Sequence, residues 1–135
     1  MKKSLFIPLF ATLMFAFTNC KSNQPTDITG KWLIETANGT STTEAMNEAF
    51  ITFGDSGRVN GCAGVNTFFG DYTLSDGAFR ISNIGMTRMM GHNIEIEDAV
   101  CDALNNSAKI KVDGNTATIF NAANEAIITL KKAEE

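Results

Sequence analysis

Apolar and polar residues alternate along most of the chain after residue 28, which is the pattern of strands that bury one face of a sheet. In the stretch GKWLIE, Trp32 and Ile34 fall on one face, whereas Leu33 and Glu35 fall on the other. The same period recurs downstream and predicts further strands at 50–53, 58–62, 108–112, 116–120 and 126–130, and two more within 66–85.

Turn residues separate these segments in pairs. Gly54-Asp55-Ser56-Gly57 stands between the strands at 50–53 and 58–62, and Ser75-Asp76-Gly77 divides the segment 66–85. Asp-Gly between alternating segments is a strong local signal for a hairpin, so both pairs are predicted to be hairpins. The polar segment TSTTEAMNEA, residues 40–49, is interpreted as a loop.

One segment has helical rather than strand spacing. In NIEIEDAVCDALNN, residues 93–106, Ile96, Val100, Ala103 and Leu104 recur on one helical face. Asn93 is expected to cap this helix with its side chain, and the acids of the segment, Glu97 among them, are interpreted as a solvated face. The residues themselves therefore predict a β-rich α+β domain with a single inserted helix.

The N-terminal segment has the architecture of a bacterial secretory signal. Lys2 and Lys3 precede the apolar run 5–17, which is too short for a membrane-spanning helix, and Cys20 follows it. We predict a lipoprotein signal peptide at 1–19, lipidation of Cys20, a tether at 20–27 and the domain at 28–132; cleavage by the ordinary signal peptidase is the alternative.

Composition narrows the classes of partner. The 135-residue chain carries 11 Lys and Arg against 15 Asp and Glu. Without Lys2 and Lys3 the balance is 9 to 15, so the chain lacks the grouped basic residues that bind phosphates and no nucleic-acid partner is expected. Beyond Cys20, the chain has Cys62 and Cys101, which form either a disulfide or two free thiols. The residues alone do not decide between these alternatives.

Catalytic and metal chemistry find little support in the residues. The stretch GRVNGCAGVNTFFG has no lysine where a phosphate-binding loop needs one. A cysteine hydrolase would need Cys62 or Cys101 to meet His92, the single histidine of the chain. No zinc-ligand spacing is present, so no catalytic residue, metal or cofactor is expected. Three methionines, Met86, Met89 and Met90, are interpreted as core residues rather than as the lining of an apolar groove.

Taken together, these motifs resemble the META domain family of bacterial lipoproteins. The resemblance covers most of residues 28–132 and rests on GKWLI, GRVNG, GVNTFFGDYTL, IGMTRMM, EDAVCDAL and AIITLKK. It implies an α+β fold in which a small antiparallel sheet curves into an open or cracked barrel with one helix packed against it. The positions that carry the family fingerprint are Trp32, Gly61, Asn66, Gly70, Tyr72, Thr87 and Arg88.

The fingerprint residues suggest structural roles. Asn66 is expected to hydrogen-bond its own backbone in a turn, Gly70 to permit a close strand approach, and Tyr72 to fix an apolar face by its hydroxyl. Thr87 and Arg88 are expected beside the Asn66 loop, where Arg88 could bind carbonyl groups or a ligand.

The sequence also departs from the family pattern. Many members carry cysteines at the positions held here by Val65 and Gly91, and both are missing together, as loss of a disulfide would require. We therefore hypothesise a substitute bridge between Cys62 and Cys101.

No catalytic activity is established for the family, whose associations are with heat stress and secretion. The resemblance implies a non-enzymatic lipoprotein of the Gram-negative cell envelope, anchored in the outer membrane and facing the periplasm or the outside. Its domain is expected to bind an apolar ligand or an envelope protein. A structural or assembly factor that binds through a sheet edge or the methionine-rich segment is the alternative.

Overall fold

The computed structural model describes residues 26–134. The strands and the helix follow one another along the chain as β1 (Gly30–Ala37), β2 (Thr40–Ser41), β3 (Phe50–Phe53), β4 (Arg58–Cys62), β5 (Thr67–Ser75), β6 (Ala78–Met86), α1 (Ile94–Asn105), β7 (Lys109–Asp113), β8 (Thr116–Phe120) and β9 (Ala126–Lys132). The expected signal peptide and most of the tether lie outside the described residues. Within them, no helix has the length and apolar character needed to span a membrane.

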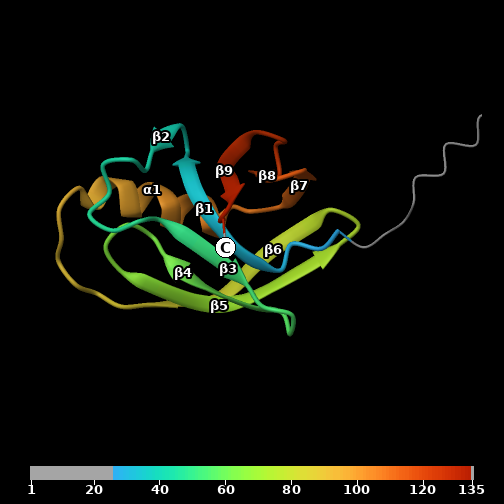
Figure 1. Ribbon diagram of the computed structural model, residues 1–135, viewed down its shortest axis with the longest axis horizontal. Helices are drawn as coiled ribbons and strands as arrows, with labels where there is room; N and C mark the ends of the chain where they lie inside the picture. Colours follow the sequence, from blue (N-terminus) through green and yellow to red (C-terminus); the bar gives the residue numbers. More distant parts are fainter. Residues whose placement is uncertain (1–25, 135) are drawn as a thin grey trace, which may run out of the picture.

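The strands form one antiparallel sheet whose two ends meet (Figure 1). Neighbouring strands follow the order β2-β1-β3-β4-β5-β6-β7-β8-β9, and an additional pairing of β1 with β9 closes a ring that leaves only β2 outside. The joint between β6 and β7 is weak, because the register there holds a single residue pair, Ala78 with Lys109. Helix α1 packs against β1, β9 and β6. The expected cracked barrel with one helix is thus confirmed.

Local turn chemistry explains the hairpins. In the β5–β6 hairpin, Asp76 and Gly77 both have positive φ (50° and 84°), as a two-residue turn that matches strand twist requires. The β3–β4 hairpin pairs Phe53 with Val59 across the predicted turn. Both predicted hairpins are confirmed, and the loop assignment of 40–49 holds apart from the short strand β2.

The interior of the ring is filled with side chains. Trp32, Phe53, Phe68 and Phe79 are each at most 2% exposed and pack with aliphatic residues from every long strand. The Trp32 indole donates a hydrogen bond to the Ile28 carbonyl at 2.9 Å, so its polar atom is satisfied within the core. Large apolar side chains at this density leave the barrel a packed scaffold rather than a container.

Two fingerprint glycines allow strands to approach closely. A Cβ at Gly61 would collide with the Phe50 carbonyl and with the Phe68 ring, and a Cβ at Gly70 would lie 2.8 Å from the Ser82 carbonyl oxygen. Tyr72 packs edge-on against Phe53, with ring centroids 5.1 Å apart, and donates its hydroxyl to the Gly54 carbonyl at 2.7 Å. Gly70 and Tyr72 therefore have the structural roles that were expected of them.

Helix α1 buries the predicted face, with Val100, Ala103 and Leu104 in the main core. Its start differs from the prediction. Asn93 adopts a left-handed conformation (φ 54°), and its side chain makes no capping hydrogen bond. Instead it donates to the Glu44 carbonyl at 2.6 Å, which ties the helix start to the loop before β3.

Candidate functional site

Three loops meet at one end of the barrel, beside the N-terminus of α1. We call residues 42–49, 63–66 and 87–93 the loop rim. Asn47 donates its backbone N–H to Gly64 and its side-chain amide to the Val65 carbonyl, which joins the first loop to the second. The Asn93 bond to Glu44 joins the first loop to the third. These contacts make the rim one continuous surface, although its parts lie far apart in sequence.

A buried carboxylate organises the rim. Glu97, in the first turn of α1, is 4% exposed. Its Oε1 accepts hydrogen bonds from the backbone N–H groups of Val65 (3.1 Å) and Asn66 (2.5 Å), and its Oε2 accepts one from the Asn66 side-chain amide (2.8 Å). Bonds from three N–H donors to an anion compensate for its burial, so helix and loop are fixed to each other.

Asn66 carries this network on to the third loop. Its Oδ1 accepts from the Met89 backbone N–H (2.6 Å) and from the Thr87 hydroxyl (3.0 Å), while its amide also donates to the Met89 carbonyl. The residue is 3% exposed. The expected turn within its own backbone is wrong, because the side chain spans from one loop to another. Thr87 lies beside the Asn66 loop, as expected.

The prediction that Glu97 lies on the solvated face of the helix is wrong. Glu97 stands three and seven residues before the core positions Val100 and Leu104, and it therefore lies on the same helical face. An acid on an apolar stripe was the signal that it would be buried. Its partner could not be read from the sequence, because Asn66 lies on a distant loop.

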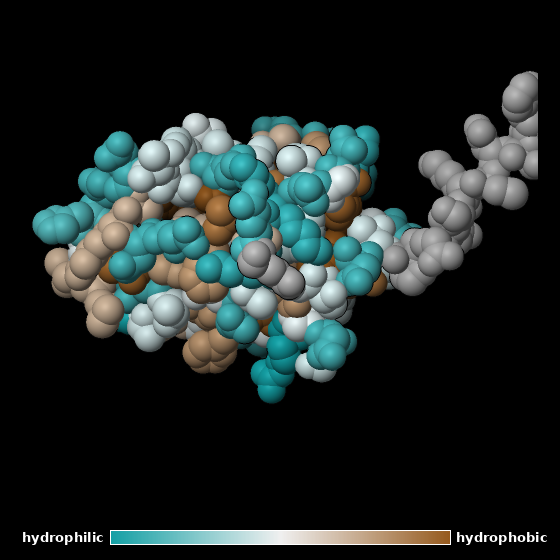
Figure 2. All heavy atoms as spheres, in the orientation of Figure 1, coloured by the Kyte–Doolittle hydropathy of each residue, from teal (hydrophilic) through white to brown (hydrophobic). Residues whose placement is uncertain are grey.

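Apolar side chains project from the rim into solvent. Met46 is 53% exposed, Met89 65%, Met90 97% and Ile94 40%; we call these four residues the rim patch. Figure 2 shows hydrophobic colouring along the loop that Figure 1 draws at the left end of the molecule. The prediction that the methionines fill the core is wrong for Met89 and Met90. Only Met86, at the end of β6, packs against the core.

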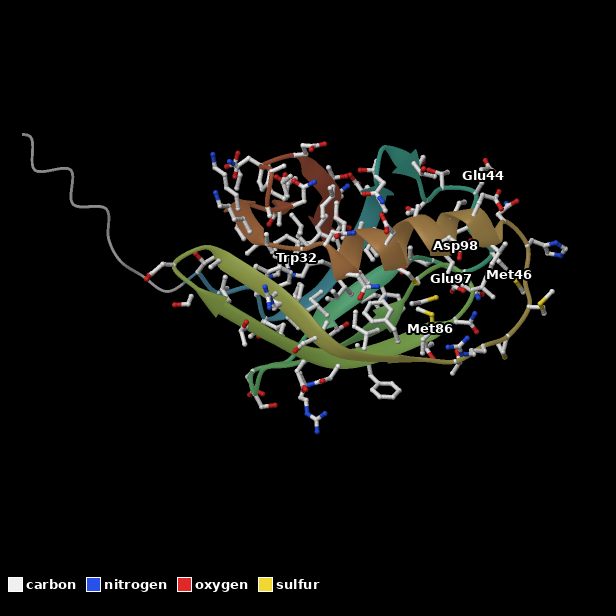
Figure 3. The ribbon with its side chains drawn as sticks, turned by 180° about the vertical axis from the view of Figure 1, so that it is seen from behind. Trp32, Glu44, Met46, Met86, Glu97 and Asp98 are labelled. Carbon is white, nitrogen blue, oxygen red and sulfur yellow. The ribbon has the colours of Figure 1, made fainter. Side chains whose placement is uncertain are left out.

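Acidic side chains flank the part of the rim patch that lies beside α1. Figure 3 shows Glu44, Met46, Glu97 and Asp98 near the same end of α1. Glu44, Glu95 and Asp98 are all exposed. Arg88, also exposed, makes no hydrogen bond or ion pair with any residue in the described part of the chain, so the expected binding of carbonyl groups is not seen.

Val65 and Gly91, the positions at which the resemblance to the META family leads one to expect cysteines, lie side by side in this chain. A Cβ at Gly91 would lie 2.6 Å and 2.9 Å from the two γ-methyl groups of Val65, and 2.9 Å from the Met46 sulfur. A disulfide between these positions would hold the second and third rim loops together. Here the Asn66 bonds to Met89 join the same two loops instead.

Cys62 and Cys101 are free thiols in the structure, so the hypothesised substitute bridge is not present in it. Gly61 faces the interior with Phe68, and alternation turns the next residue, Cys62, to the other face of the sheet. Cys101 instead packs against the main core from α1, with its Sγ 3.8 Å from the Met86 sulfur. The two sulfur atoms thus approach opposite faces of the sheet.

Neither thiol has the surroundings of a nucleophile. Burial, together with the nearby carboxylates of Glu97 and Asp98, raises the pKa of the Cys101 thiol to about 11. His92 is exposed and makes no hydrogen bond to either cysteine among residues 26–134. In the same range, no three His, Cys, Asp or Glu side chains come together closely enough to hold a metal ion.

Comparison with known proteins places this architecture in a family. Residues 26–134 match the family model described as META domain. Heat shock protein HslJ of Escherichia coli strain K12 is 27% identical over 137 aligned residues, which cover 95% of this chain and 96% of HslJ.

Solved structures share the fold. An NMR structure of a protein 27% identical to this chain has a TM-score of 0.59 and covers 76% of this chain and 87% of its own. An NMR structure of a protein from Burkholderia xenovorans (20% identity, TM-score 0.61, 78% and 83% covered) and a crystal structure of a DUF4847 family protein from Bacteroides vulgatus (16%, 0.57, 79% and 94%) resemble it in fold alone. Since the family model spans the whole described barrel, its helix and its rim, the protein belongs to the META domain family.

Proposed function

We propose that the protein is a non-enzymatic lipoprotein of the cell envelope, tethered through Cys20, and that it binds another envelope protein through the rim patch. The observation that carries this proposal is the exposure of Met46, Met89 and Met90 on loops that a buried polar network holds in place. A similarity to a protein named for heat shock supports a role under stress.

The rim patch has two properties of a docking surface. Exposed apolar side chains that gather in one place mark interaction sites more often than isolated ones do. Methionine side chains are flexible and polarisable, and they adapt to the shape of a partner. The backbone beneath them is fixed by Asn66 and Glu97, which limits the conformational entropy lost on binding.

The position of the rim fits a tethered protein. The described chain begins at Thr26, near Gly57 and Tyr72, at the end of the molecule opposite the loop 87–93 (Figure 1). A lipid on Cys20 would hold the Thr26 end close to the membrane. The rim patch would then face away from the membrane surface, toward proteins of the envelope.

Photocrosslinking in cells tests the proposal. A benzoylphenylalanine at position 90 is expected to give a discrete adduct with one envelope protein, whereas the same group at Asn115, in the exposed β7–β8 turn, is expected to give none. Mass spectrometry identifies the adduct, and position 89 is expected to capture the same protein. Equal labelling from positions 90 and 115, or no adduct at either rim position, would overturn the proposal.

A second candidate is binding of a small apolar ligand at the weak β6–β7 joint. Because the barrel interior is filled, such a ligand would occupy an outer groove of about 480 Å³, lined in part by Ala78, Ala108, Ile110 and Phe120. Organic extraction of the protein purified from membranes, followed by mass spectrometry, tests this candidate. A bound lipid that disappears in Phe120→Ser would support it, and an empty extract would remove it.

A further inference from the structure

We infer that the rim patch takes a basic amphipathic segment of its partner, a stretch with one apolar face flanked by Lys or Arg. This inference rests on the proposed function and adds the chemistry of the partner. It follows from the charges on the segments that form the rim and the start of α1.

The segments that form the rim and the start of α1 are strongly acidic. Residues 42–49, 63–66 and 87–98 contain five acidic residues and one basic residue, Arg88. Glu97 is buried and accepts hydrogen bonds from Val65 and Asn66. Glu48 forms an ion pair with Lys31 at 3.2 Å. The other three acids, Glu44, Glu95 and Asp98, are exposed and form no ion pair within residues 26–134.

These three carboxylates stand on the two elements that carry Met46 and Ile94, two of the four residues of the patch. Glu44 precedes Met46 by two residues, and Glu95 and Asp98 follow Ile94 in the first turns of α1. The Asn93 side chain bonded to the Glu44 carbonyl holds the two elements together. An apolar surface bordered by unpaired carboxylates is complementary to a segment that combines apolar residues with Lys or Arg.

Strands β7–β9 do not repeat this combination. Strands β7–β9 carry Lys109, Lys111, Lys131 and Lys132 against Asp113 as the one acid within the strands. These strands would repel a basic segment. The charge distribution therefore favours the rim over strands β7–β9 as the surface toward which a cationic partner is attracted.

Methionine methyl NMR gives a direct test. From Cys20 onward the chain contains four methionines, three in the rim patch and Met86 under α1, and the described residues 26–134 hold the complete ring of strands with its core. Protein from Cys20 onward, labelled at the methionine methyl carbons, is titrated with a peptide of Leu and Lys whose leucines stand at i, i+3, i+4 and i+7. The same peptide with Glu in place of Lys is the matched probe.

The Lys peptide is expected to shift the methyl resonances of Met46, Met89 and Met90 while Met86 stays in place, and the Glu peptide is expected to shift none. Neutralising two carboxylates in Glu44→Gln/Glu95→Gln is expected to weaken binding about fivefold. The control Asp113→Asn/Glu125→Gln, which removes the same charge far from the rim, is expected to change it little.

The inference is overturned if the Lys peptide leaves the rim methyl groups unmoved, or if both peptides bind equally. Either result leaves the proposed function standing as long as benzoylphenylalanine at position 90 still captures an envelope protein, since the partner would then present other chemistry. Loss of that adduct removes the proposed function itself, so the two failures are distinguishable.

Discussion

The barrel and the loop rim reach order by different physical routes. In the barrel, Trp32, Phe53 and their neighbours are packed by the hydrophobic effect, which needs only the correct periodicity of apolar residues. In the rim, the organising groups are the polar side chains of Glu97 and Asn66, and the apolar methionines point outward. The rim thus inverts the arrangement of the barrel, and this inversion distinguishes a surface for binding from a scaffold for support.

The difference also bears on the cysteine pattern. In family members with cysteines at the positions of Val65 and Gly91, a covalent bond can join the second and third rim loops. This chain joins the same loops through Asn66 and the Met89 backbone. Noncovalent bonds of this kind stabilise the rim only as long as every buried partner is satisfied.

The largest effect is expected from breaking the barrel. Phe53→Ala removes a ring that is 1% exposed and packs against Tyr72 and Phe79. The cavity should lower the free energy of unfolding by about 3–5 kcal/mol, measured by urea denaturation. The control Phe69→Ala, on a side chain 60% exposed, should cost about 1 kcal/mol or less. Similar losses in both variants would contradict a packed interior.

The next largest effect on stability is expected from adding a disulfide bond to the rim. In Val65→Cys/Gly91→Cys the new side chains would be adjacent, and oxidation should raise the free energy of unfolding by about 3 kcal/mol relative to the reduced form. Peptide mapping checks the pairing, and thermal melts with and without reductant give the gain. Gly91→Ala alone should destabilise, because its Cβ would press on the Val65 methyl groups. Failure to oxidise would contradict the adjacency of the two loops.

The barrel could be predicted from the sequence and the rim could not, for a physical reason. Hairpins are specified locally: Asp76 and Gly77 impose the turn, and alternation then fixes which residues face inward. The rim depends on contacts between residues far apart, such as Asn66 with Glu97. The place of Glu97 on the apolar stripe indicates that it is buried, but a polar side chain does not reveal its distant partner, so the contact with Asn66 and the exposure of Met89 and Met90 do not follow from the sequence.

A smaller effect is expected from opening the rim network. Asn66→Ala leaves the Met89 N–H and one Glu97 oxygen without their partner, and should lower the free energy of unfolding by about 2 kcal/mol. Hydrogen exchange should show lost protection concentrated in the loop 87–93. The control Asn60→Ala, on an exposed β4 side chain, should change stability by about 0.5 kcal/mol at most. Uniform loss of protection over the whole chain would mean that rim and barrel unfold as one unit.

The smallest effect is expected from ionisation of the Cys101 thiol, which lies where α1 contacts the barrel. The folded thiol has a pKa of about 11, raised from 9.0 by burial, so the unfolded chain loses this proton first as pH rises. The free energy of unfolding therefore falls as the pH rises from 9 to 11. The stabilising contribution of this thiol, which is fully present below pH 9, is lost through that window. Because the side chain is only half-buried, solvent screening should limit the loss to about 1 kcal/mol.

The difference in unfolding free energy between wild type and Cys101→Ala isolates this thiol. Burial also raises the pKa of Tyr72, and that residue titrates in both proteins, so its contribution cancels in the difference. The wild type should lose its advantage over the variant as the pH rises from 9 to 11 and lose nothing between pH 7 and 8. An unchanged difference across the whole range would mean that Cys101 is as solvated in the folded protein as in the unfolded chain. Helix α1 would then be held to the barrel by Val100, Ala103 and Leu104 without the Cys101 contact to Met86.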